Sequence, residues 1–334
     1  MKDKKVLLAN SLLLLALLIF VSIPHIANIV FRLNGSITEN VSLLLSGGTS
    51  VIALGGIALL YCRITKRRFS KVMVIKKITT KQAFLTMFVV FGTYIFAMGI
   101  NSISMKLFPI VIKDGMEISK LVSNSSTLLG LIVIVLIPAF FEEVFFRGIF
   151  LDAYEGKSKK IKYFIIITIF ATFHGNIMQI IYVLFLGFIL LEIREYTGSL
   201  LGSMLFHATN NAISFTLSKV AKHYIKTMNT GLDLEQAAAT AEAMNVSLYV
   251  VMIRASIFFL IGGAILFINL RKLKEYKEEK DGLEIIEEEE YIQAEYVQEE
   301  KYIVEDGEVI GDKKQYIPLI IYFISITILI IKSY

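Results

Sequence analysis

The stretch from residue 128 to residue 150 reads LLGLIVIVLIPAFFEEVFFRGIF. Its first fourteen residues are uncharged and mostly apolar, and they run directly into Glu142, Glu143 and, one turn later, Arg147. A membrane-spanning helix needs about 20 predominantly apolar residues. Ionisable side chains inside such a helix are costly and usually face the bundle interior or a water-filled cavity. The stretch therefore predicts a membrane helix that carries a buried polar site.

The composition extends this prediction to the whole chain. Of the 334 residues, 55% are hydrophobic and 19% are charged, and the mean hydropathy is +0.67. An average globular protein has roughly 45–50% apolar and about 25% charged residues. We therefore expect an all-α, polytopic membrane helical bundle. The single cysteine, Cys62, excludes an internal disulfide framework and a cysteine-rich metal site.

We expect about eight or nine transmembrane helices in this bundle. The apolar stretches lie near residues 6–24, 41–62, 84–108, 127–150, 161–174, 177–193, 199–218, 248–270 and 316–331. The last of these is short, so it is either a helix packed beside the bundle or a peripheral anchor.

Lysine and arginine residues predict the orientation. Eight lie between Arg63 and Lys81, four lie within residues 157–162, and five lie within residues 271–280. With alternating spans all three loops fall on the side of the N-terminus, which the positive-inside tendency assigns to the cytoplasm. We expect a multi-pass protein of the cell membrane with a cytoplasmic N-terminus. Its partner is then the lipid bilayer, with no nucleic acid.

The chain divides into four regions. Residues 1–83 are expected to form N-terminal helices and a basic cytoplasmic loop, and residues 84–270 the core. Residues 271–315 hold 16 of the 29 acidic residues, a composition that predicts a disordered cytoplasmic segment. Residues 316–334 are expected to form a C-terminal hydrophobic helix.

Polar residues recur at a similar depth in two further spans. His174 ends the fifth span, and His207 and Asn211 lie in the seventh. At about 1.5 Å per residue, these residues and Glu142 fall in a band from about 9 to 18 Å above the cytoplasmic face. The four side chains can therefore converge on one site.

The fifth and sixth spans are too short for two full crossings. Residues 163–193 number 31, whereas two ordinary spanning helices need about 40. A break at residues 174–176 must then fall inside the membrane, where non-helical backbone persists only if protein or cavity water satisfies it. This predicts a buried polar cavity at the break.

Local spacing predicts different tasks for these polar residues. Glu143 and Arg147 are four residues apart with the acid first, the favourable order for a helical ion pair. Glu142 points in another direction and is left as the free carboxylate, a candidate general base. His207 and Asn211 share one helical face, where they would hold a water molecule or stabilise an oxyanion.

Three motifs resemble those of the CPBP family (CAAX protease and bacteriocin-processing, or Abi) of intramembrane proteases. They are EExxxR at residues 142–147, FxxxH at residues 170–174 and HxxxN at residues 207–211. Each motif alone is weak, but the three in order, within apolar spans, form a specific signal. The resemblance identifies roughly residues 84–270 as a CPBP-like protease core.

The resemblance implies a helical membrane endopeptidase that acts on a membrane-associated protein or peptide. By this similarity Glu142 activates the hydrolytic water, and His174 positions that water or transfers a proton. His207 and Asn211 stabilise the oxyanion, and the Glu143–Arg147 pair shapes the site.

Family members have been classed both as metalloproteases and as glutamate proteases. His174, His207 and Glu142 would be the ligands of a zinc ion with an open coordination position. A carboxylate that binds metal cannot also be the free base, so we favour a metal-free glutamate mechanism and commit to no cofactor.

Two other functions are compatible with these residues. A non-catalytic membrane regulator or bacteriocin-immunity protein would keep the fold and act by binding. A proton-coupled transporter would use Glu142 and the histidines as a relay, but it would be expected to show inverted repeats. Complete motifs favour the enzyme. The sequence does not distinguish a prenylated CAAX protein from a peptide pheromone, a bacteriocin leader or a membrane regulator as substrate.

Overall fold

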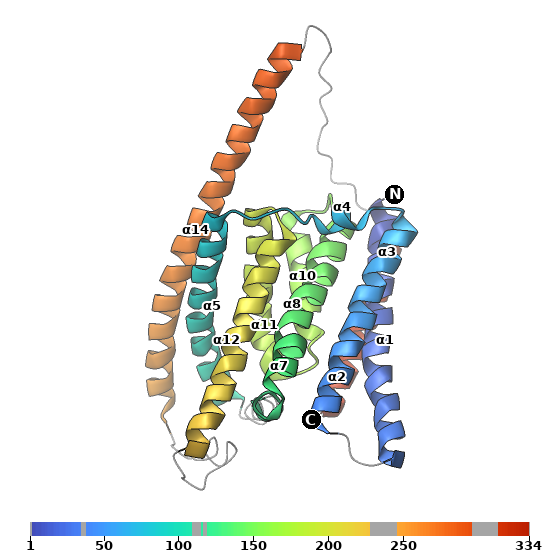
Figure 1. Ribbon diagram of the computed structural model, residues 1–334, viewed down its shortest axis with the longest axis vertical. Helices are drawn as coiled ribbons and strands as arrows, with labels where there is room; N and C mark the ends of the chain where they lie inside the picture. The colour runs from blue at the N-terminus through green and yellow to red at the C-terminus, as the bar shows by residue number, and fades with distance from the viewer. Residues whose placement is uncertain are drawn as a thin grey trace.

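The computed structural model describes residues 2–34, 38–108, 115, 119–227, 246–295 and 313–333. Within these residues the chain forms helices and no strand, which confirms the all-α prediction. The helices run roughly side by side as a bundle (Figure 1). We call one end of it the basic end, where α3 (Ile57–Thr65) finishes and α5 (Thr80–Leu107) begins, because residues 63–81 hold eight lysines or arginines.

Among the described residues, six helices are long and apolar enough to cross a membrane, so the chain is a multi-pass membrane protein. They are Lys4–Val30, Glu39–Thr65, Thr80–Leu107, Thr127–Ala153, Leu248–Leu283 and Lys313–Lys332. The expected count of eight or nine is not confirmed. The helix α10 (Lys159–Thr172) has 14 residues, about 21 Å of rise, and the neighbouring α11 (Ile177–Thr197) and α12 (Leu200–Thr227) are not among the six either.

The stretch quoted first forms one helical rod whose pitch alternates. Its parts in chain order are α7 (Thr127–Gly130), the π-helix η2 (Leu131–Leu136), α8 (Ile137–Glu142), the π-helix η3 (Glu143–Ile149) and α9 (Phe150–Ala153). Pro138 lies at the start of α8 and brings no N–H group, so the preceding turn cannot keep a full set of α-helical hydrogen bonds. Short π-helical stretches are frequent at functional sites, and η3 contains both Glu143 and Arg147.

The predicted break between the fifth and sixth spans is confirmed. The helix α10 ends at Thr172, and α11 begins at Ile177. Gly175 has a φ of 69°, a left-handed conformation that glycine adopts at no steric cost. Asn176 then caps α11, because its side-chain oxygen accepts a hydrogen bond from the backbone N–H of Gln179 at 2.9 Å.

Aromatic side chains form the core where η3 meets α10. Phe145, Phe146 and Phe170 are fully buried. The Phe146 ring meets the Phe145 ring edge-on at 5.0 Å and the Phe170 ring at 5.1 Å. Edge-to-face pairs of this kind are favourable beyond their buried area. This cluster fixes the distance between the first two motifs.

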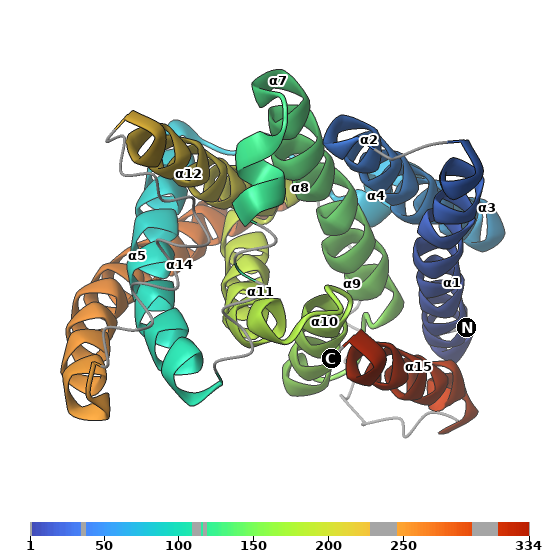
Figure 2. The same ribbon diagram turned by 90° about the horizontal axis from the view of Figure 1, so that it is seen from below.

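On one flank of the bundle, α14 (Leu248–Glu295) packs against α5 (Figures 1 and 2). The two backbones approach closely at a pair of glycines. A Cβ on Gly262 would lie 2.8 Å from the carbonyl oxygen of Gly92, and a Cβ on Gly92 would lie 3.1 Å from the carbonyl oxygen of Gly262. Small residues permit this contact between membrane helices, whose association depends on close packing.

The helix α14 continues beyond the apolar stretch and into the acidic segment. It has 48 residues, about 72 Å of rise, and its second half projects beyond the basic end (Figure 1). The disorder expected over residues 271–315 is therefore not found as far as Glu295, and residues 296–312 lie outside the described residues. Ion pairs four residues apart, such as Arg271–Glu275 and Lys274–Glu278, provide the local helix support.

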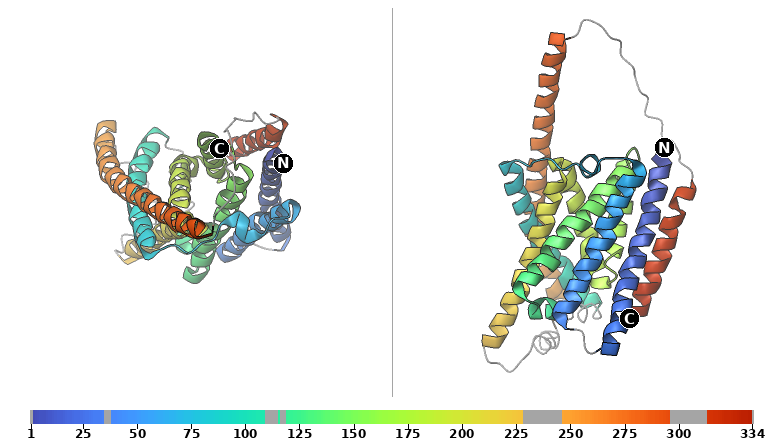
Figure 3. Two further views of the ribbon diagram at one scale, coloured as in Figure 1. Left: turned by 90° about the horizontal axis from the view of Figure 1, so that it is seen from above. Right: turned by 45° about the vertical axis from the view of Figure 1, so that its right-hand side comes forward.

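On the opposite flank, α15 (Ile317–Ser333) packs along α1 (Lys2–Asn34), as Figure 3 shows. The side chain of Asn10 links three elements. It donates to the carbonyl oxygen of Gln315 at 2.9 Å and accepts from the hydroxyl of Tyr154, which follows α9, at 2.9 Å. The last apolar stretch is thus a helix packed beside the bundle. The helix α2 (Glu39–Ser50) and the π-helix η1 (Val51–Gly56) lead into α3 on the same flank.

Candidate active site

Glu143 is the centre of a buried polar network. Its Oε1 atom accepts a hydrogen bond from Nη1 of Arg147 at 3.1 Å, and Nδ1 of His207 lies 2.9 Å from the same oxygen. The side chains of Glu143 and Arg147 are fully buried. The predicted Glu143–Arg147 ion pair is present, and α12 supplies a second partner for the carboxylate.

Arg147 is held by the neighbouring helices as well. Its Nη2 atom donates to the backbone carbonyl of Gly187 in α11 at 3.3 Å. Its guanidinium carbon lies 4.0 Å from the ring centroid of Phe170, within the range of a cation–π interaction. Arg147 thereby ties η3 to both α10 and α11.

Glu142 lies beside the network and, in the described part of the chain, has an oxygen without a partner, as does Glu143 through its Oε2 atom. The buried Oε2 atom of Glu142 has no hydrogen-bond partner among the described residues, and the side chain is 19% exposed. The Nε2 atom of His207 lies 3.9 Å from this oxygen, too far for a direct hydrogen bond. A water molecule at hydrogen-bond distance from both atoms fits this separation.

His174 lies at the broken end of α10. Its Nδ1 atom is 2.9 Å from the carbonyl oxygen of Phe170, which leaves Nε2 as the nitrogen available for other contacts. The imidazole is also within electrostatic range of Glu142 and His207. The structure therefore brings all three motifs to one place.

Phe170 is the side chain around which the three motifs pack. Its ring lies 5.2 Å from the ring of His174 and 6.2 Å from the ring of His207, edge-on in both cases. The same ring lies against Arg147. Sequence reasoning did not assign Phe170 to the site, although it is the first residue of the FxxxH motif.

Asn211 contacts the helical rod that precedes Glu142. Its Nδ2 atom donates to the carbonyl oxygen of Ile134 at 3.3 Å. Pro138 is four residues after Ile134 and has no N–H to offer that carbonyl, so the asparagine supplies the missing donor. The side-chain amide carries two N–H bonds, and the second remains for another acceptor. The adjacent Asn210 is buried and accepts from the hydroxyl of Tyr182 at 2.8 Å.

The ligand set considered for zinc, His174, His207 and Glu142, is not gathered into one cluster in the described part of the chain. Within the described part of the chain, no group of three or more His, Cys, Asp or Glu side chains is placed to hold a metal ion. His207 directs Nδ1 to Glu143, and His174 directs Nδ1 to a backbone carbonyl. Both contacts leave Nε2 of the histidine free, as in histidines that bind a metal through Nε2.

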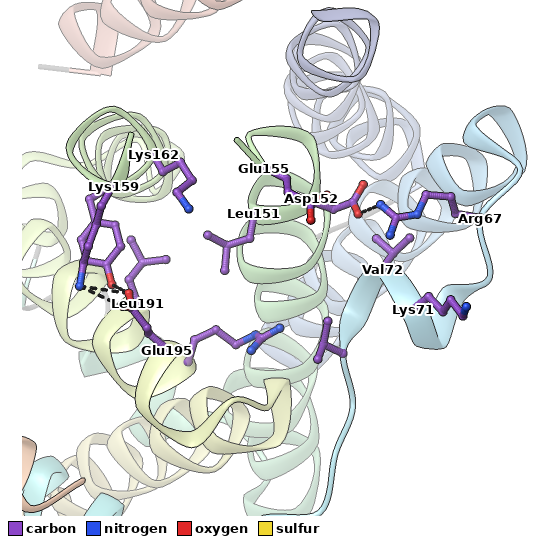
Figure 4. Close-up of a pocket in the computed structure, with 13 residues that line it drawn as sticks. Arg67, Lys71, Val72, Leu151, Asp152, Glu155, Lys159, Lys162, Leu191 and Glu195 are labelled. Atoms are coloured by element: carbon purple, nitrogen blue, oxygen red, sulfur yellow. Dashed lines mark hydrogen bonds and ion pairs between the residues drawn. The ribbon is translucent and has the colours of Figure 1, made fainter. Parts of the chain in front are cut away.

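A cavity of about 400 Å³ lies between this network and the basic end (Figure 4). Its wall includes Leu151, one turn beyond Arg147, and Leu191, one turn beyond Gly187. It also includes Arg194, which is within electrostatic range of Glu143. The basic stretches at residues 63–81 and 157–162 indicated the charge of this end of the bundle. The sequence analysis did not predict that Arg194 lines the cavity.

Comparison with known proteins agrees with the geometry. Residues 124–213 match the family model of type II CAAX prenyl endopeptidase Rce1-like proteins, and the match includes all three motifs. Searches of curated proteins and of solved structures found no match. The segment that builds the polar network is thus similar in sequence to Rce1-like proteins, which confirms the resemblance to the CPBP proteases and supports a CAAX-type intramembrane protease fold.

Proposed function

We propose that this protein is an intramembrane endopeptidase that hydrolyses a peptide bond of a membrane-associated protein or peptide by means of a glutamate-activated water. The observation that carries the proposal is the position of His207, whose Nδ1 is 2.9 Å from Glu143 and whose Nε2 is 3.9 Å from Glu142. This imidazole connects a buried ion pair to a carboxylate oxygen that has no partner within the described residues.

Glu142 acts as the general base in this mechanism. Its free Oε2 accepts a proton from a water molecule while the water oxygen attacks the carbonyl carbon of the scissile bond. The C–O bond forms, and the carbonyl π electrons move onto oxygen to give a tetrahedral oxyanion. The protonated Glu142 then gives its proton to the amide nitrogen, and the C–N bond breaks. His174 holds the attacking water through its remaining ring nitrogen.

His207 and Asn211 stabilise the oxyanion. The Nε2 atom of His207, when it carries a proton, and the second N–H of the Asn211 side chain are the two donors. Glu143 fixes the imidazole through Nδ1, and Arg147 fixes Glu143. These donors are held before the substrate arrives, which is the condition under which such groups stabilise a developing charge most effectively.

The site is proposed to face the cytoplasmic half of the cell membrane. The basic end would be cytoplasmic, since it carries the lysines and arginines of residues 63–81 and 157–162. Substrate would then be a membrane-associated chain that reaches Glu142 from that side or from within the bilayer.

Hydrolysis is tested by comparing new N-terminal peptides in membrane fractions of cells that express wild type, Glu142→Gln or Glu155→Gln at equal levels. Glu155 is exposed and outside the network, so Glu155→Gln is the matched control. New termini present with wild type and Glu155→Gln, and absent with Glu142→Gln, support the protease. Identical termini in all three, with a biological phenotype that survives Glu142→Gln, would instead support a regulator or immunity protein that acts by binding.

A further inference from the structure

The cavity near the basic end is lined by an excess of basic side chains. It lies between α4 (Phe69–Met73), α9, the start of α10 and the end of α11 (Figure 4). Three acidic residues line it, Asp152, Glu155 and Glu195. Five basic residues line it, Arg67, Lys71, Lys159, Lys162 and Arg194.

Two of the three acidic side chains already form ion pairs with basic side chains of the cavity wall. Arg67 forms an ion pair with Asp152, and Lys159 lies 3.1 Å from the carboxylate of Glu195. The hydroxyl of Tyr163 also donates to Glu195 at 2.6 Å. Burial alone would raise the pKa of Glu195, but these hydrogen bonds outweigh it and hold the pKa below the usual value. Glu195 is therefore ionised and paired with Lys159.

Lys162 and Arg194 form no ion pair among the described residues, and Glu143, the carboxylate within electrostatic range of Arg194, is already paired with Arg147. The Nε atom of Arg194 is buried without any hydrogen-bond partner in that part of the chain. Figure 4 shows Lys162 extending from α10 toward the space in front of α9. A partly buried cation without an ion-pair partner is costly, so an anion in this part of the cavity would stabilise the protein at rest as well as during turnover.

The level of the cavity indicates where that anion comes from. The spans Glu39–Thr65 and Thr127–Ala153 end beside it, which places the cavity where the helices leave the hydrocarbon core. Phospholipid headgroups occupy this level of the membrane at all times, whereas a substrate is present only transiently. Basic pockets between membrane helices are known to bind acidic headgroups.

We propose that Arg194 and Lys162 bind the phosphate of an acidic phospholipid headgroup in this cavity. The planar guanidinium of Arg194 can pair with two phosphate oxygens, and the Lys162 ammonium supplies a compact point charge. Val72 and Leu151 in the same wall provide apolar contact for the glycerol end of the lipid. Cavities of roughly 300–1,000 Å³ are the usual size for ligand sites of this kind.

The test measures lipid binding by the full-length protein in a neutral detergent. Phosphatidylglycerol, and phosphatidylcholine with the same acyl chains, are titrated while thermal unfolding and lipid retention in native mass spectrometry are recorded. Phosphatidylglycerol should raise the Tm of wild type, since a ligand of the folded state stabilises it, and phosphatidylcholine should not. In Lys162→Gln/Arg194→Gln the affinity for phosphatidylglycerol should fall by roughly thirtyfold.

The matched control is Lys160→Gln/Arg68→Gln. It removes the same charges from the same end of the bundle, at exposed residues outside the cavity, and should bind phosphatidylglycerol as wild type does. If Arg194→Gln lowers the yield of folded protein, Lys162→Gln is compared with Lys160→Gln, which lies on the same helix.

Three results would overturn the proposal. One is equal loss of binding in the cavity variant and the matched control. Another is equal stabilisation of wild type by inorganic phosphate alone, which would assign the cavity to a free anion. The third is that neither phosphatidylglycerol nor phosphate binds in the cavity and only a peptide with a free C-terminal carboxylate does, which would assign the cavity to substrate. Lipid binding should survive Glu142→Gln, so this outcome is separate from the outcome for hydrolysis.

Discussion

The Nδ1 atom of His207 lies 2.9 Å from the Oε1 atom of Glu143, the same oxygen that accepts from Arg147. The third motif is therefore anchored on the first motif through a carboxylate that is fully buried. This contact turns the other ring nitrogen of His207 toward Glu142. The sequence predicts the Glu143–Arg147 ion pair as a local feature of one helix. In the structure the same pair also holds His207 of a second helix in place.

Breaking the buried ion pair should strongly destabilise the protein. Arg147→Met leaves the Glu143 charge uncompensated, and the loss in free energy of unfolding should be about 3–5 kcal/mol. Urea or thermal unfolding in detergent measures it. The control is Glu275→Gln, which removes one partner of the exposed Arg271–Glu275 pair and should change stability by about 0.5 kcal/mol or less. Equal losses in the two variants would contradict this account of the buried pair.

Asn211 should be coupled to Pro138 through the Ile134 carbonyl. Asn211→Ala removes the side-chain donor and should cost about 1–2 kcal/mol. In the Pro138→Ala background a backbone N–H becomes available to that carbonyl, so the same substitution should cost less. A double-mutant cycle on unfolding free energies measures the coupling, expected to be at least about 0.5 kcal/mol. Strict additivity would show that the asparagine does not replace the missing N–H.

Tyr322 should position the broken end of α10. Its buried hydroxyl lies 3.1 Å from Oγ1 of Thr172 and donates to the carbonyl oxygen of Ile169 at 3.3 Å. Tyr322→Phe should cost about 1 kcal/mol of stability. It should also lower kcat by about tenfold, because small displacements at a reacting centre are costly.

The control for Tyr322→Phe is Tyr316→Phe, which changes another tyrosine of this C-terminal stretch at a partly buried position. Its stability and kcat should stay close to those of wild type. A change in KM alone, with kcat unaffected in Tyr322→Phe, would mean that Tyr322 affects substrate binding rather than the reacting groups.

The contact between α5 and α14 should tolerate no side chain at Gly262. A Cβ there would lie 2.5 Å from the backbone nitrogen of Phe96, whereas a Cβ on the adjacent Gly263 would meet nothing nearer than 3.8 Å. Gly262→Ala should therefore destabilise the protein by about 1–3 kcal/mol. Gly263→Ala should be neutral or stabilise it by about 0.5–1 kcal/mol, because alanine favours helix. Thermal unfolding in detergent compares the two, and changes of the same sign and size would refute the close contact.

Local features of the site were predictable from the sequence. The apolar run before Glu142 predicts the span that the structure shows as Thr127–Ala153. The spacing of Glu143 and Arg147 predicts their ion pair. The shortness of residues 163–193 predicts the break that Gly175 and Asn176 make. Each of these depends on one continuous stretch of the chain, where helical geometry leaves few alternatives.

The second half of α14 differs from what its composition predicts. Its acidic content predicts disorder, yet the helix continues to Glu295. Lysines and arginines placed four residues before acidic residues, as in Lys277 and Asp281, favour the helix locally. The four-residue spacing of opposite charges supports the helix here, although the segment is strongly acidic.

The sequence by itself determined the helical class, the membrane setting and the three motifs, since hydrophobic length and four-residue spacing are properties of a single helix. Only the tertiary structure decided that His207 pairs with Glu143, that Asn211 serves the Ile134 carbonyl, and that Tyr322 holds the end of α10. These contacts join residues that lie about 60 to 150 positions apart. Such partners are selected when helices pack and every buried polar group must find a donor or acceptor, and that choice depends on the three-dimensional arrangement of all the helices.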